Sequence, residues 1–159
     1  MGHPRWLTAT SASVFHIVFS TKGRTQLIRA DLQPRLWNYM AAIARNRGVR
    51  VLAVGGTTDH VHVLVELPAE AKLAEVVRTV KCNSSRWVRE KCPIFQWQQG
   101  YGAFSVSPSQ VERVKQYVRN QAEPSHPFLR GRVRGDVGGG EAELQAGTGV
   151  WLSVAPEGA

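Results

Sequence analysis

At 159 residues, the chain is long enough for one domain with a substantial core, and its 43% of hydrophobic residues is ordinary for a globular protein. Lys and Arg outnumber Asp and Glu by 20 to 12, and the resulting formal charge of +8 favours an acidic partner such as nucleic acid. No apolar run approaches the roughly 20 residues needed to span a bilayer, and the N-terminus lacks the apolar centre of a signal peptide, so we expect a cytoplasmic protein with no membrane partner.

The first third of the chain predicts a strand followed by a helix. Residues 13–20, SVFHIVFS, alternate as a strand does, with His16 on the face opposite Phe15, Ile17 and Phe19. After a basic loop, residues 31–48 predict a helix that Asp31 caps and Gly48 ends. The apolar stripe of this helix is formed by Leu32, Leu36, Met40 and Ile43.

The remaining elements are two strands, a helix, a short strand and a last helix. Strands are predicted at residues 49–56 and 60–67, a helix at 72–91 and a strand at 101–107. A third helix begins near residue 107, with Ser107 or Ser109 as its cap. The order β-α-β-β-α-β indicates an α+β, ferredoxin-like (RNA-recognition-motif-like) fold, with a four-stranded antiparallel sheet, helices on one face and a further C-terminal helix.

Two histidines open the third predicted strand, in the segment GGTTDHVHVLVEL (residues 55–67). Residues two apart on a strand share a face at a spacing of about 6.6 Å, so His60 and His62 should project side by side, on the face opposite the helices. Two parallel imidazoles can chelate one divalent cation. Taken alone, however, the pattern is more often just two polar residues on the open face of a sheet.

A tyrosine and a glutamine stand four residues apart on the last helix. Tyr117 and Gln121 should therefore lie on the same helical face. A phenol with a pKa near 10 is a poor nucleophile unless a metal polarises the electrophile, and Gln121 could supply an oxygen to that metal. Two imidazoles and one amide suit Mg²⁺ or Mn²⁺ with open coordination positions. The alternative for Tyr117 is a half-buried aromatic flanking an apolar stripe.

The segments DHVHVLVEL, NSSRW, QQGYGAFSVS and QYVRNQ, in this order and spacing, resemble the single-tyrosine transposases of the insertion sequence 200/605 family, within the His-hydrophobe-His endonuclease superfamily. The resemblance covers residues 13–121 and implies the ferredoxin-like fold. It also implies that His60, His62 and Gln121 hold Mg²⁺ or Mn²⁺ and that Tyr117, on the C-terminal helix, is the nucleophile.

The implied activity is that of a transposase that nicks single-stranded DNA through a 5′-phosphotyrosine intermediate and rejoins the strands. The implied partners are single-stranded DNA with a hairpin at the element ends and a second copy of the chain, as a homodimer in which the tyrosine helix can serve either subunit. We expect a cytoplasmic enzyme that is nucleoid-associated when bound to DNA.

Several side chains near these motifs are candidates for supporting roles. Basic side chains are expected to follow the DNA phosphates, and the candidates are Lys22, Arg24, Arg78, Lys81, Arg86 and Lys115. His16 is a candidate for a role beside the metal pair, or facing DNA, if its strand neighbours that of His60 and His62.

The two ends of the chain differ from the rest. Residues 1–12 are expected to be a flexible N-terminus. Residues 122–159 hold 8 of the 15 glycines, and three Arg against five acidic residues give this tail a charge of −2. Such composition predicts disorder or loose packing. The tail departs from the family pattern, and a shifted reading frame near residue 123 is one hypothesis for it; catalysis would be impaired if the usual ending docks the tyrosine helix.

Other functions remain open on the sequence alone. One is a domesticated relative that cuts at chromosomal repeats, and another is a non-catalytic module that binds single-stranded nucleic acid. The second expects aromatic stacking residues on the open sheet face, whereas the third strand presents His60, His62, Leu64 and Glu66 there. A small metal-storage or hydrolytic protein is disfavoured by the positive charge and by Tyr117.

Overall fold

The structure, a computed structural model, describes residues 12–121. Its strands are β1 (Ala12–Ser20), β2 (Arg50–Gly56), β3 (His60–Pro68) and β4 (Gly102–Val106). Its helices are α1 (Gln33–Asn46), α2 (Leu73–Arg89) and α3 (Val111–Arg119), with short 3-10 turns η2 (Lys22–Arg24) and η3 (Pro108–Gln110). The predictions for the first 11 residues and for the glycine-rich tail lie outside the described residues.

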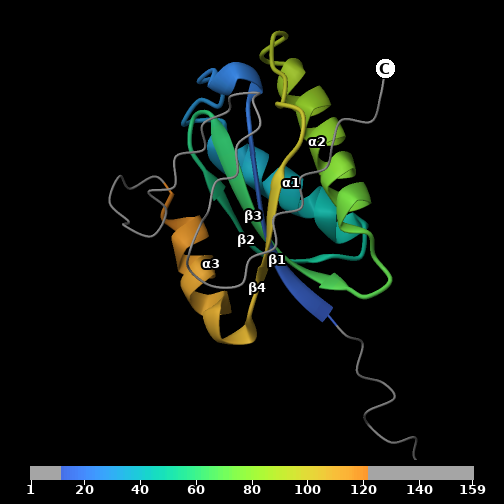
Figure 1. The fold of residues 1–159 in the computed structure, drawn as a ribbon. Helices are drawn as coiled ribbons and strands as arrows, with labels where there is room; N and C mark the ends of the chain where they lie inside the picture. The colour runs from blue at the N-terminus through green and yellow to red at the C-terminus, as the bar shows by residue number, and fades with distance from the viewer. Residues whose placement is uncertain (1–11, 122–159) are drawn as a thin grey trace, which may run out of the picture.

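The four strands form one antiparallel sheet in the order β2-β3-β1-β4 (Figure 1). This is the arrangement produced by two interleaved β-α-β units, so the predicted ferredoxin-like sheet is confirmed. In the central pair, Ser20 of β1 lies opposite His60 of β3, and Val18 lies opposite His62. The histidines of β3 therefore face the carboxyl end of β1.

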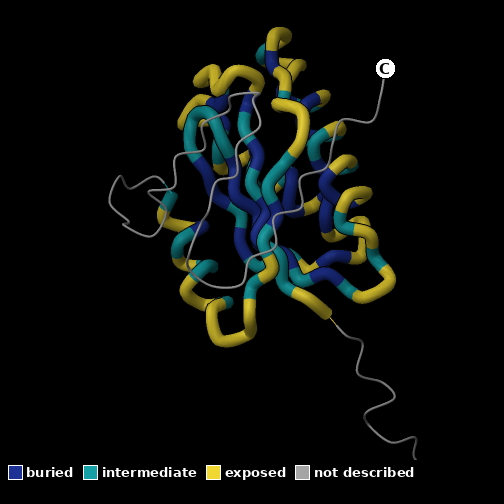
Figure 2. Tube along the Cα trace, viewed as in Figure 1, coloured by how far each residue is buried: buried dark blue, intermediate teal, exposed yellow. Residues whose placement is uncertain are grey.

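Two apolar clusters cover the two faces of the sheet. The larger lies between the sheet and helices α1 and α2, and includes Ile17, Leu36 and Val63. The smaller joins Ala53, Leu64 and Val118 under α3. Helices α1 and α2 pack on one face, as expected for the ferredoxin-like unit, and the further C-terminal helix α3 covers part of the other. Since β3 is covered on both sides, it is buried along most of its length (Figure 2).

The predicted side-chain caps at the helix N-termini are not formed. Helix α1 begins after Leu32, and Asp31 instead pairs with Arg29, at 3.1 Å from Nε to Oδ1. Gly48, with φ of 75°, follows α1 as predicted. Neither Ser107 nor Ser109 caps α3 with its side chain, because η3 intervenes between β4 and α3. Among residues 12–121, no helix has the length and apolar character to cross a membrane.

A glycine lets α3 approach β2 closely. The pairing of β2 with β3 shifts between Val51 and Ala53, and this irregularity brings Gly55 opposite His62. A Cβ atom at Gly55 would collide with the backbone carbonyl oxygen of Val118. The last turn of α3 therefore rests directly on the β2 backbone, beside His62.

We predict that Gly55→Ala displaces α3 from the sheet and lowers the free energy of unfolding by about 1–3 kcal/mol, the usual effect of overpacking. Urea denaturation measures the loss, and amide hydrogen exchange locates it. Gly48→Ala is a suitable control, because it strains a positive-φ position with open space around it, away from α3. Faster exchange should be confined to α3 in Gly55→Ala alone; unchanged α3 protection would contradict the proposed contact.

Candidate active site

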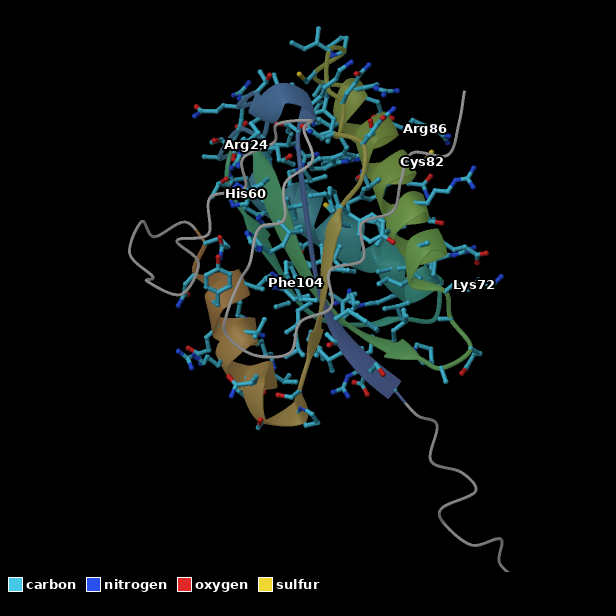
Figure 3. The ribbon with its side chains drawn as sticks, in the orientation of Figure 1. Arg24, His60, Lys72, Cys82, Arg86 and Phe104 are labelled. Carbon is cyan, nitrogen blue, oxygen red and sulfur yellow. The ribbon has the colours of Figure 1, made fainter. Side chains whose placement is uncertain are left out.

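His60 and His62 lie side by side at the start of β3, as the spacing predicts. Their ring centroids are 5.0 Å apart, with the ring planes at 75°. His60 is partly exposed, whereas His62 is only 4% exposed because α3 lies over it. Figure 3 shows His60 beside Arg24, at the end of the sheet where β1 runs into η2.

The His60 ring is held by its neighbours in the β2–β3 turn. Its Nδ1 lies 2.7 Å from Asp59 Oδ1 and 2.8 Å from Thr57 Oγ1. The Thr57 hydroxyl also donates to Asp59 Oδ1, at 3.0 Å. A carboxylate acceptor on Nδ1 favours the tautomer with its proton there, which leaves Nε2 as the lone-pair nitrogen for a metal.

Asp59 is suited to remain ionised in this position. Burial alone would raise the pKa of its carboxyl, but the hydrogen bonds from His60 and Thr57 and the charges of His60 and Arg24 outweigh burial and lower that pKa. Arg24 approaches Asp59 Oδ2 at 3.4 Å. The carboxylate thus orients the His60 ring and also anchors η2.

His16 reaches His62 from the neighbouring strand. His16 Nε2 lies 2.9 Å from His62 Nδ1, and the two rings are nearly parallel, with centroids 5.1 Å apart. With Nδ1 bound to His16, the nitrogen of His62 that can bind a metal is Nε2. The structure therefore brings His16 into contact with the histidine pair, in a position to orient His62.

Both buried imidazoles are neutral near pH 7. Burial lowers the pKa of His16 to about 4. Burial, followed by the charges of His16 and His60, lowers the pKa of His62 to about 2. A neutral imidazole is the form that binds metal, so His62 needs no deprotonation at physiological pH.

Tyr117 of α3 lies against the histidines within the same chain. Its ring centroid is 5.6 Å from that of His62 and 6.1 Å from that of His16, and both contacts are edge-to-face. The residue is partly exposed, while its neighbour Val118 is fully buried and fixes the helix. The nucleophile candidate and the histidine pair, separated by more than 50 residues in sequence, thus converge.

Gln121 follows α3 and bonds back to it. Its side-chain Nε2 donates to the carbonyl oxygen of Tyr117 at 2.9 Å. This contact holds the amide within one turn of Tyr117 and leaves the amide oxygen as the atom suited to a metal. Because α3 ends at Arg119, Gln121 lies beyond the helix and not on a shared helical face as predicted, and this bond keeps its amide near the Tyr117 backbone.

The donor set can be compared with what a divalent cation needs. Within residues 12–121, no three His, Cys, Asp or Glu side chains are arranged to hold a metal ion. A site here would use Nε2 of His60 and His62, with an amide oxygen and water completing it. That mixture, with open positions, fits Mg²⁺ or Mn²⁺ better than a closed zinc centre.

The predicted basic residues are distributed over both faces of the sheet. Lys22 and Arg24 stand on η2, where Arg24 pairs with Asp59, and Lys115 lies on α3, 3.7 Å from Glu112. The other three are on α2, behind the sheet from the histidines: Arg78, Lys81 and Arg86. Arg78 and Arg86 are exposed, but Lys81 is tethered to backbone carbonyls of Gln98 and Gly100, each at 2.7 Å.

Three residues of the site were not predicted. Thr57 and Asp59 fix the His60 ring, and Gly55 admits α3. The aspartate directly before the histidine pair was a usable signal, since a carboxylate beside a metal-binding imidazole commonly orients it. The role of Gly55 depends on the irregular strand pairing and has no comparable signature.

Comparison with known proteins assigns the chain to a family. A family model described as "Transposase IS200 like" matches residues 9–121. This chain belongs to the IS200-like transposase family. The transposase of insertion sequence element IS200 from Salmonella typhimurium is 23% identical over 131 residues, covering 77% of this chain and 82% of that protein. The ISDra2 transposase TnpA of Deinococcus radiodurans is 22% identical over 115 residues, covering 67% and 82%.

Two solved structures share the fold of this transposase family member. A protein of Deinococcus radiodurans assigned as a transposase superposes with a TM-score of 0.59 at 22% identity, covering 76% of this chain and 98% of that one. A REP-associated tyrosine transposase bound to a REP hairpin gives a TM-score of 0.52 at 16% identity, covering 74% and 70%.

We predict that the metal-free protein loses stability as the pH falls below about 6.5. An unfolded histidine titrates near 6.5, but His16 in the folded protein titrates at about 4, so the unfolded state takes up the proton first. Stability is therefore complete above pH 6.5 and is lost on acidification toward pH 4, by about 2 kcal/mol at pH 5 from His16 alone.

Urea denaturation in the presence of a chelator, at pH 7 and pH 5, measures this loss. The variant His16→Gln removes one titrating imidazole and should lose about 2 kcal/mol less between the two pH values. An identical pH dependence in the variant would show that His16 is not buried in its neutral form.

Proposed function

We propose that this protein is a metal-dependent tyrosine transposase that nicks single-stranded DNA and rejoins the strands. The observation that carries the proposal is the position of Tyr117, whose ring lies 5.6 Å from that of His62 in a member of the IS200-like family. A phenol placed beside two imidazoles with available lone pairs suits phosphoryl transfer better than passive binding.

The chemistry begins with attack of the Tyr117 oxygen on a backbone phosphorus of a single strand. The new bond is a 5′-phosphotyrosine linkage, and the bond that breaks releases a free 3′-OH. In the second step, the 3′-OH of another strand attacks the same phosphorus and releases Tyr117. Each step exchanges one phosphodiester bond for another, so no ATP is consumed.

His60 Nε2, His62 Nε2 and the Gln121 amide oxygen would hold Mg²⁺ or Mn²⁺. When bound, the ion neutralises charge on a non-bridging oxygen of the phosphate under attack. Asp59 and His16 fix the two imidazole rings through Nδ1, at 2.7 and 2.9 Å. His16 is thus a positioning residue for His62.

Candidate DNA contacts on the elements that flank this site are Lys22 and Arg24 on η2 and Lys115 on α3. Since a relative of the same fold was solved with a REP hairpin, we propose that this chain also binds single-stranded DNA carrying a hairpin at the element ends.

A homodimer is part of the proposal. In this structure, Tyr117 adjoins the histidines of its own chain, so a single subunit can contain the whole constellation.

A domesticated relative acting at chromosomal repeats would use the same chemistry on different DNA, and its substrate distinguishes it. The similarity to a REP-associated transposase favours including repeat sequences among the test substrates.

A non-catalytic single-stranded nucleic-acid-binding module is disfavoured, because α3 occludes the sheet face on which bases would stack.

We predict that Tyr117→Phe abolishes formation of the covalent protein–DNA adduct while leaving DNA binding within about twofold, because only the attacking oxygen is removed. The assay incubates end-labelled single-stranded oligonucleotides from the DNA flanking the gene with Mn²⁺ and resolves adducts on a denaturing gel. Tyr101→Phe is the matched control, since Tyr101 packs with the main core. Adduct formation by Tyr117→Phe would exclude the assigned nucleophile.

We further predict that His60→Ala removes cleavage and lowers Mn²⁺ affinity at least about tenfold, because one of two imidazole ligands is lost. Titration calorimetry measures affinity independently of cleavage. The variant should remain folded, because His60 is partly exposed and outside both apolar clusters. Normal cleavage by His60→Ala would show that the ligand assignment is wrong.

A further inference from the structure

A second candidate site lies on the opposite face of the sheet from Tyr117. An open cavity of about 600 Å³ is formed by η2, α2 and the segment that leads into β4. Its lining includes Lys22, Lys81, Ser85, Arg89 and Trp97, with three glutamine side chains from residues 96–99. The mixture of cations, amides and an indole differs from the imidazole site and is not used by the proposed strand-transfer chemistry.

The walls of the cavity are held rigidly. Trp97 packs edge-to-face against Phe19 and Phe95, with centroids 4.8 Å apart in both cases. Its indole Nε1 donates to Ser84 Oγ at 2.9 Å, which explains one serine in the middle of α2. Such a fixed aromatic wall loses little conformational entropy on binding a flat ligand.

Polar groups of the cavity retain capacity for a ligand. Lys81 Nζ uses two of its three N–H groups on backbone carbonyls, and Arg89 uses Nε on the carbonyl of Phe95 at 2.9 Å. Ser85 is 7% exposed, and among residues 12–121 its Oγ is the buried side-chain polar atom without a hydrogen-bond partner. An unsatisfied buried hydroxyl is unusual and calls for an incoming partner.

The cavity and the histidine pair adjoin the same strand end. Ser20 lies opposite His60 in the β1–β3 pairing, and its carbonyl accepts a hydrogen bond from the backbone N–H of Gln98 at 2.8 Å. Two strand spacings, about 10 Å, therefore separate the backbone of β3 from that of residues 96–98. Between the two sites, η2 presents Arg24 beside Asp59 and Lys22 beside the cavity.

We propose that this cavity seats one unpaired nucleotide of the same DNA strand that is cleaved, with the strand passing around η2. The base would pack in the Trp97 wall, the glutamine amides and the Ser85 hydroxyl would meet its edge, and Lys22, Lys81 and Arg89 would meet phosphate. That the occupant is the cleaved DNA strand rests on the proposed function. The cavity and its lining are observed independently of that function.

Cys82, labelled on α2 in Figure 3, provides a direct reporter, because it is exposed and lines the cavity. Cys92 is partly exposed and lies outside the lining. The full chain carrying Tyr117→Phe is treated with a maleimide, with and without saturating single-stranded oligonucleotides from the DNA flanking the gene. DNA should slow alkylation of Cys82 by about tenfold, as expected for stable seating of a base, and leave Cys92 unchanged. Unprotected Cys82 at saturating DNA overturns the proposal, as does equal protection by inorganic phosphate.

An abasic scan tests for a single seated base. Oligonucleotides with one base removed at each position in turn should reveal one position at which affinity falls about tenfold. Cys82→Trp, which fills the cavity from an exposed position, should abolish that dependence, and Cys82→Ala, which leaves the cavity empty, should preserve it. Sensitivity retained by Cys82→Trp would place the base elsewhere and overturn the proposal.

The adduct assay on the wild-type chain separates the two proposals. Protection of Cys82 without any Tyr117 adduct would refute the transposase chemistry and leave the nucleotide site standing. An adduct formed by a protein whose Cys82 stays unprotected would refute the nucleotide site alone.

Discussion

The close contact between α3 and the β2 backbone is the constraint on which the candidate site depends. An extra residue in β2 brings Gly55 opposite His62; without it, Val54 would occupy that position. Because Gly55 has no side chain, the Val118 carbonyl can rest on the strand, and Tyr117, one residue earlier, falls over the imidazoles. The phenol is therefore positioned by backbone geometry in a strand to which it does not belong.

The same contact determines the electrostatics of the histidines. With α3 in place, His62 and His16 are removed from water, and burial holds the pKa of both well below that of a free imidazole. Their mutual hydrogen bond satisfies one nitrogen of each buried ring, Nε2 of His16 and Nδ1 of His62. Docking of α3 thus keeps both imidazoles neutral, which is the state a divalent cation requires.

The periodic features of the molecule were predictable, and the irregular ones were not. Alternation in β1 and β3 predicts both the sheet and the pairing of His60 with His62, since a strand has only two faces. The failed cap at Asp31 and the coverage of the second face by α3 depend on contacts between distant segments. The bulge near Leu52 leaves no mark in composition, so the position of Tyr117 over His62 could be inferred only through the family resemblance.

The distribution of positive charge bears on how DNA would reach this site. The exposed arginines of α2 lie on the other side of the sheet from Tyr117, so the sheet stands between them and a phosphate bound at the histidines. The turn η2, at the end of β1, carries basic side chains toward both faces, with Arg24 at Asp59 and Lys22 at the cavity. A polyanion that contacts both faces of the sheet would therefore follow η2, because crossing elsewhere would forgo these charges.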